Sequence, residues 1–216
     1  NCVERYGDDR IYLPNVIARK AFSLYVEDLQ NGGEIASRGP AWIEAQRAQS
    51  HGWSSLYTNL LVARVDFAEG RCERGLHRMD RFTQRMEVFP SLRAMLLTDG
   101  FPCMTDPATQ LAARAELRQL VNYNIDAAPI MRAYLVLASI ETGDIASARK
   151  LLQERRRYAN LDRSLAELYT VLDDALLHNR PVESDRQAAI IRVFVWNPDA
   201  RTAIVRTLSN RPMLAA

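Results

Sequence analysis

Apolar residues recur every three or four positions through most of this chain, and short glycine-containing turns separate the recurring segments. The pattern is clearest between Asp126 and Asn160, where one helix is expected before the turn Glu141-Thr142-Gly143-Asp144 and another after it. A 3.6-residue period places the apolar side chains on one face of each helix. Two such helices joined by a short turn predict an α-helical hairpin.

The same period predicts further helices on both sides of this hairpin. Gly70 ends one helix, Pro90 closes the next, and Asp106-Pro107 opens a third as an N-cap followed by proline. The stretch Ile190–Trp196 is rich in β-branched residues, but its flanks favour helix. The expected helices cover residues 54–67, 76–89, 107–122, 161–177, 183–196 and 198–208, with weaker ones at 16–29 and 41–49.

These patterns predict an all-α fold of stacked antiparallel helical hairpins, with an irregular helical bundle as the alternative. We expect one domain over residues 1–216: a less regular part at 1–50, hairpins at 54–178 and capping helices at 183–216. With 48% hydrophobic and 25% charged residues, the composition is that of a globular protein. The net charge of +2 argues against a nucleic-acid partner, and the apolar runs are too short for membrane insertion.

The segment from Tyr134 to Leu152 resembles a tetratricopeptide repeat. Its large and small residues and its turn fall at the offsets of that family, at Leu135, Gly143, Asp144, Ala148 and Leu152. A poorer copy centres on Gly70, with Gly75 and Met79 at the matching positions. Asn160 replaces the closing proline of the pattern, Val136 stands at a small position, and Gly100–Met104 is no standard repeat turn. The resemblance implies a stack of hairpins with a concave groove that binds a peptide or a partner domain.

The opening residues Asn1–Asp9 resemble the segment that follows the last membrane span in polytopic glycosyltransferases and in O-antigen ligase or polymerase-type proteins. This resemblance implies an alternative function, as the extracytoplasmic tail of such a protein, where the chain would position substrate or a partner. It also favours the periplasmic side of a membrane over the cytoplasm. No catalytic residue is carried over, because catalysis in those families belongs to the membrane part.

Three cysteines, at positions 2, 72 and 103, lack the close spacing of a structural zinc site. Cys72 and Cys103 lie in separate predicted elements, each beside a turn. They either form a disulfide, which indicates an oxidising compartment, or pack as small buried side chains. Cys2 stays unpaired in both interpretations.

Known catalytic and phosphate-binding motifs are absent from the sequence, and its three histidines lie far apart. A small helical enzyme using His51 or His77 would need a third polar group nearby, and the sequence indicates none. We therefore expect a non-catalytic scaffold for protein–protein interaction, with no metal and no cofactor. The residues expected to contact the partner, from their helix positions alone, are Tyr57, Asn59, Arg64, Arg132 and Tyr134.

Overall fold

The computed structural model describes residues 23–24, 56–83, 90–123, 129–154 and 161–209. Within these ranges the secondary structure is helical and contains no strand, so the predicted all-α class is confirmed. In chain order the elements are α4 (Leu56–Ala68), α5 (Cys72–Thr83), α6 (Pro90–Gly100), the 3-10 turn η2 (Phe101–Cys103), α7 (Pro107–Tyr123), α8 (Pro129–Glu141), α9 (Ile145–Gln153), α10 (Arg163–Leu176), α11 (Ser184–Phe194) and α12 (Pro198–Ser209).

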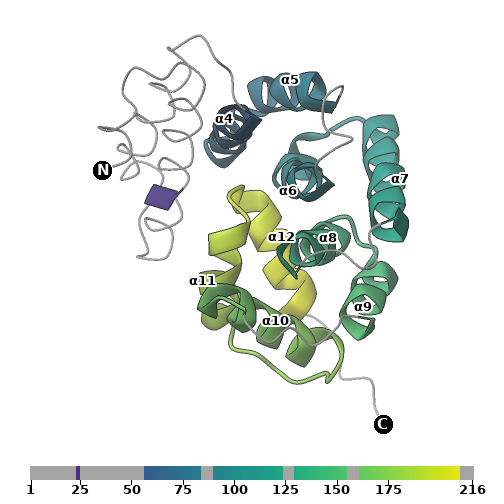
Figure 1. The fold of residues 1–216 in the computed structure, drawn as a ribbon, viewed down its shortest axis with the longest axis vertical. Coiled ribbons are helices and arrows are strands. Elements are labelled where there is room, and N and C mark those ends of the chain that lie inside the picture. The colour runs from purple at the N-terminus through teal and green to yellow at the C-terminus, as the bar shows by residue number, and fades with distance from the viewer. Residues whose placement is uncertain (1–22, 25–55, 84–89, 124–128, 155–160, 210–216) are drawn as a thin grey trace.

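The helices follow a curve in which α4, α6 and α8 lie on the inside and α5, α7 and α9 on the outside (Figure 1). Each inner helix packs against the outer helix that follows it, and α6 packs closely on both α4 and α8. The C-terminal helix α12 lies inside the curve, against α8 and η2. We call the sides of α4, α6 and α8 that face the C-terminal helices the inner face.

The local signals for turns and helix starts are confirmed. Gly143 has φ of +79°, a left-handed conformation that glycine adopts without a steric penalty, at the predicted turn between α8 and α9. Asp144 then caps α9 by accepting a hydrogen bond from the Ser147 main-chain nitrogen. Asp106 does the same for Thr109 at the start of α7. Short polar side chains at these positions satisfy main-chain donors that the helix leaves unpaired.

Two differences from the sequence analysis concern the ends of helices. Helix α6 begins at Pro90, because proline is accommodated in the first turn of a helix. The period analysis assigned no helix there. The stretch Ile190–Trp196 is helical only as far as Phe194, because Val195 is extended. The weaker helices expected at 16–29 and 41–49 lie outside the described residues, apart from the helical residues 23 and 24.

The hairpin of α4 and α5 depends on a small residue. A Cβ atom placed on Gly75 would lie 2.4 Å from a carbon of the Phe67 ring, far inside van der Waals contact. On the other side of the ring, a Cβ on Gly100 of α6 would lie 2.9 Å away. The fully buried Phe67 ring is therefore held between two glycines, and the close approach of the three helices requires both.

A disulfide joins Cys72 of α5 to Cys103 of η2, with the two Cα atoms 5.2 Å apart. It ties the outer helix α5 to the turn that directly follows α6. Of the two interpretations of these cysteines, the structure shows the bridge. Cys2, which is expected to stay unpaired, lies outside the described residues.

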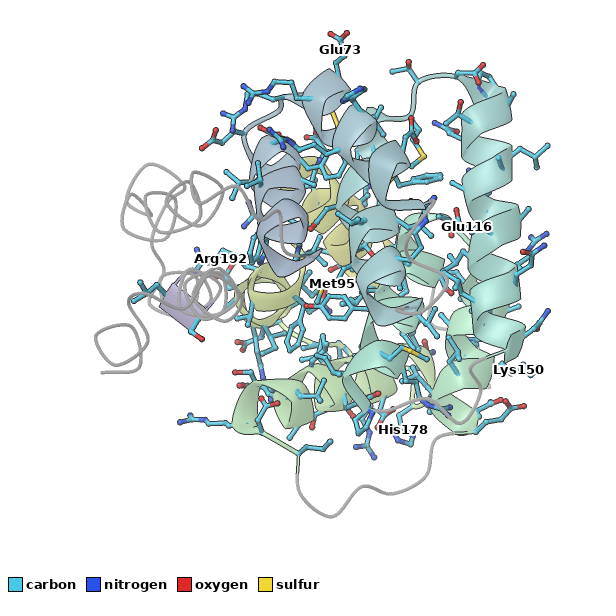
Figure 2. All side chains as sticks on the ribbon, turned by 45° about the horizontal axis from the view of Figure 1, so that its top comes forward. Glu73, Met95, Glu116, Lys150, His178 and Arg192 are labelled. Atoms are coloured by element: carbon cyan, nitrogen blue, oxygen red, sulfur yellow. A yellow bond between two sulfur atoms is a disulfide. The ribbon has the colours of Figure 1, made fainter. Side chains whose placement is uncertain are left out.

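The apolar core extends along the whole curve, from α4 to α12. Figure 2 shows Met95 of α6 in this interior, whereas Glu73 and Lys150 extend outward from the outer helices. Among the described residues, no helix combines the length and the apolar character that crossing a membrane requires.

Candidate functional site

The inner face carries a buried ion pair. Arg64 of α4 is 1% exposed, Asp99 of α6 is fully buried, and the Arg64 Nε donates to Asp99 Oδ2 over 2.5 Å. Charges are buried in proteins almost only when they are paired, because an isolated charge loses its hydration without compensation. This pair joins two neighbouring inner helices, at the C-terminal end of α6.

The same two side chains hold the main chain of a segment far along the sequence. Asp99 Oδ1 accepts hydrogen bonds from the main-chain nitrogens of Trp196, at 2.7 Å, and Asn197, at 3.2 Å. The Arg64 Nη2 donates to the carbonyl oxygen of Phe194 over 2.5 Å. Phe194 is the last residue of α11, and residues 195–197 connect α11 to α12. We call residues 194–197 the inner segment.

The sequence explains why this connection is not helical. Asn197 precedes Pro198, and a residue before proline is displaced from helical conformation by the proline ring. The Asn197 Oδ1 then accepts hydrogen bonds from the main-chain nitrogens of Asp199 and Ala200, which starts α12. The main-chain groups of Trp196 and Asn197 consequently need partners outside a helix, and Asp99 provides them.

Aromatic rings surround the Arg64 guanidinium. Its central carbon lies 3.8 Å from the ring centre of Trp196 and 5.9 Å from that of Tyr134, distances at which a cation is attracted to an aromatic ring. Tyr134 in turn meets Phe194 edge to face, with ring centres 6.1 Å apart. Burial raises the pKa of Tyr134, against the opposing effect of the nearby Arg64 charge.

Three of the residues predicted to contact a partner lie in the interior. Arg64 and Tyr134 lie within the inner-face cluster, and Arg132, 1% exposed, donates from its Nη1 to the Leu151 carbonyl at the end of α9. All three side chains are buried in this structure, at 1% to 3% exposed. Tyr57 and Asn59 lie on α4, and their side chains are outside the described part of the structure.

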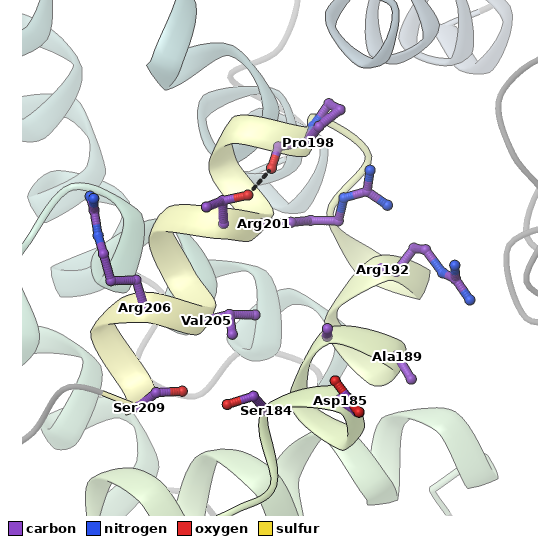
Figure 3. A pocket seen from close by; sticks show the side chains of 11 residues that line it. Ser184, Asp185, Ala189, Arg192, Pro198, Arg201, Val205, Arg206 and Ser209 are labelled. Carbon is purple, nitrogen blue, oxygen red and sulfur yellow. Dashed lines mark hydrogen bonds between the residues drawn. The ribbon is translucent and has the colours of Figure 1, made fainter.

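A second feature is a cleft of about 680 Å³ between α11 and α12 (Figure 3). Small and apolar side chains, including Ala188, Ala189 and Val205, form part of its lining. Arg192 and Arg201 extend from the two helices toward the same side, while Arg206 extends from the other side of α12. The complete lining is Ser184, Asp185, Ala188, Ala189, Arg192, Pro198, Arg201, Thr202, Val205, Arg206 and Ser209.

Glu141, the last residue of α8, has an unusual environment. Burial, and secondarily the negative charge of Asp99, raises the pKa of Glu141 to about 8. Arg206 opposes this effect, whereas Asp199 adds to it. Within the described structure, Glu141 Oε2 is buried without a hydrogen-bond partner, which fits a carboxyl group that is protonated at neutral pH.

Sequence reasoning missed Asp99, Phe194, Trp196 and Asn197. A signal for Asn197 existed, since Asn-Pro marks a helix start just as Asp106-Pro107 does. Asp99 could not be found in this way, because its partners lie 97 and 98 residues further along the chain.

Comparison of the sequence with protein-family models and with curated proteins, and of the structure with solved structures, finds no match.

Proposed function

We propose that this chain is a non-catalytic scaffold that binds an acidic segment of a partner protein in the cleft between α11 and α12. The observation that carries the proposal is the positive charge of this cleft, which is lined by three arginines and one aspartate. The arginine guanidinium binds carboxylates through paired hydrogen bonds, so a cleft of this composition favours a carboxylate-rich ligand.

Two further properties of the cleft support a peptide ligand. Small side chains on both helices leave room for a main chain to approach, and the volume of the cleft is within the range of ligand-binding sites. In addition, the Arg192 Nε is buried and makes no hydrogen bond within the described structure. An incoming carboxylate would pair this donor and remove the cost of leaving it unsatisfied.

The arrangement of the helices supports a tetratricopeptide-like stack for this scaffold. Inner and outer helices alternate, Gly70 and Gly143 both adopt positive φ at the hairpin turns, and Gly75 allows the close approach that a small position provides. In this proposal α11 and α12 are the capping helices, and they fill the space in which the sequence analysis expected an open groove.

The test is a binding titration with a fluorescent twelve-residue peptide that alternates glutamate with alanine, followed by anisotropy. We expect saturable binding that weakens as salt is raised, and no binding of the matching lysine peptide. The double variant Arg192→Ala/Arg201→Ala should lower affinity at least tenfold, about 1.4 kcal/mol. The matched control is Arg163→Ala, which removes an exposed arginine outside the cleft. Equal binding of both peptides, or equal loss in the control, contradicts the proposal.

The disulfide supports a second candidate, the extracytoplasmic tail of a membrane glycan polymerase, ligase or glycosyltransferase. Disulfides persist in oxidising compartments and are rare in reducing ones, so the Cys72–Cys103 bridge favours a location outside the cytoplasm. The test is to block free thiols in intact cells with N-ethylmaleimide and to measure labelling of the two cysteines by mass spectrometry. Labelling of both in the native host contradicts this candidate.

A further inference from the structure

We infer that the inner face of α4, α6 and α8 is a second binding site, specific for an extended peptide segment that contains Trp-Asn-Pro. In this structure the inner segment of the same chain occupies the site as a tethered ligand. The inference goes beyond the proposed function, because it concerns another face of the molecule and a ligand of different chemistry.

The first argument is that the site binds main chain. Asp99 uses one carboxylate oxygen for Arg64 and the other for two successive main-chain N–H groups, while Arg64 reaches the carbonyl oxygen of Phe194. In this structure the two side chains thus bind three main-chain groups of the inner segment. Peptide-binding sites commonly bind main-chain groups through hydrogen bonds and select particular side chains in pockets.

The second argument is that the site also selects side chains. The Trp196 indole is fully buried and stacks 3.8 Å from the Arg64 guanidinium, and the Phe194 ring packs against Tyr134. A smaller side chain at position 196 would remove the nearer of the two aromatic rings beside the buried cation. The residue after the tryptophan must have a main-chain N–H that is available to donate to Asp99. Asparagine before proline meets this requirement, because the proline ring disfavours helical conformation at the asparagine.

The third argument is the way in which the inner segment is connected. The two helices on either side of it, α11 and α12, follow a linker. In this linker His178, Arg180 and Pro181 are exposed, and Asn179 has a positive φ of 52°. The inner helices pack in hairpins with the outer helices that follow them, and the Cys72–Cys103 bridge joins α5 to η2. The tethered ligand and its site are thus separate along the chain, and the linker between them is accessible to a protease.

The test uses the full chain with a specific protease site inserted between Arg180 and Pro181. After cleavage, we expect the C-terminal fragment to remain bound in gel filtration. A labelled peptide of residues Ile190–Ala200, added in excess, should replace it while the helical circular dichroism of the remaining part is kept. In the cleaved protein, Asp99→Asn should raise the dissociation constant of the fragment at least tenfold. Thr98→Val is the matched control, because the Thr98 hydroxyl bonds only within α6, to the Ala94 carbonyl, and the expected change is below twofold.

A second measurement keeps the test decisive where Asp99→Asn does not fold. Here the cleaved wild-type protein is titrated with the same peptide carrying Trp196→Ala, and with a scrambled peptide. We expect both to compete at least tenfold more weakly than the native peptide. The inference is overturned if the native peptide does not displace the fragment, if all three peptides compete equally, or if release of the fragment unfolds the rest of the chain.

Discussion

Asp99 accepts a hydrogen bond from the main-chain nitrogen of Trp196, 97 residues later in the chain, while its other oxygen neutralises Arg64. This one carboxylate joins two inner helices and the connection between the last two helices. Its removal should therefore be among the most costly single changes in the protein. Asp99→Asn removes the carboxylate that pairs with the buried Arg64 guanidinium, and we expect a loss of about 3–5 kcal/mol in the free energy of unfolding.

Urea denaturation followed by circular dichroism measures this loss. Thr98→Val, at the neighbouring position of α6, should cost about 1 kcal/mol or less, because it removes one hydrogen bond within the helix. Equal stability of Asp99→Asn and wild type would show that the ion pair contributes little net stabilisation.

A related prediction concerns Arg132, which the sequence analysis placed at a partner surface. Because its Nη1 bonds the Leu151 carbonyl in the interior, Arg132→Met should destabilise the fold by about 1–3 kcal/mol. Replacement of the exposed Arg163 by methionine serves as the comparison and should change the free energy by about 0.5 kcal/mol or less. A neutral Arg132→Met would restore the hypothesis of a role in binding.

The disulfide should make the stability depend on redox conditions. The bridge closes a loop with a sequence separation of 31, and the loss of such a constraint on the unfolded chain costs about 3 kcal/mol. The variant Cys72→Ser/Cys103→Ser should unfold at a correspondingly lower temperature than wild type. Dithiothreitol should lower the unfolding temperature of wild type but not that of the double variant. A shift of equal size in both would mean that the reductant acts elsewhere.

Gly75 should resist the substitution that normally stabilises a helix. Glycine to alanine in a helix interior gains about 1 kcal/mol, but here the new Cβ would meet the Phe67 ring, and overpacking costs about 1–3 kcal/mol. We therefore expect Gly75→Ala to be destabilising in thermal unfolding. Combining it with Phe67→Leu, which removes the ring, should cost less than the sum of the two single changes. Strict additivity would rule out the contact as the cause.

Glu141 should make the stability decrease as pH rises. Its pKa is raised from 4.5 to about 8 in the folded chain, so between these values the folded state holds a proton that the unfolded state has lost. Stability therefore falls with pH through this window, by up to about 1.4 kcal/mol per pH unit, and stays reduced above it. Glu141→Gln removes this contribution. The difference in unfolding free energy between the variant and wild type should grow from pH 5 to pH 8 and then level off, and a constant difference would contradict the raised pKa.

Local signals allowed much of the fold to be predicted. Turn glycines such as Gly143 and capping aspartates such as Asp144 act within a few residues, so the sequence alone reveals them. Pro90 was misinterpreted because proline both ends and begins helices, and only the buried residues after it decide between the two. The inner face escaped prediction for another reason. Arg64 and Asp99 resemble ordinary surface charges until their partners, which lie up to 130 residues away, are known.

The position of the inner segment also affects the order in which the chain folds during synthesis. Arg64 and Asp99 leave the ribosome well before Phe194 and Trp196, so the early hairpins form while both charges still lack their main-chain partners. Until the last helices have been synthesised, this face must therefore remain hydrated, and any contacts that it makes must remain reversible. Completion of the buried cluster is thus a late event, which commits the molecule to its final packing only when nearly all of its helices have been made.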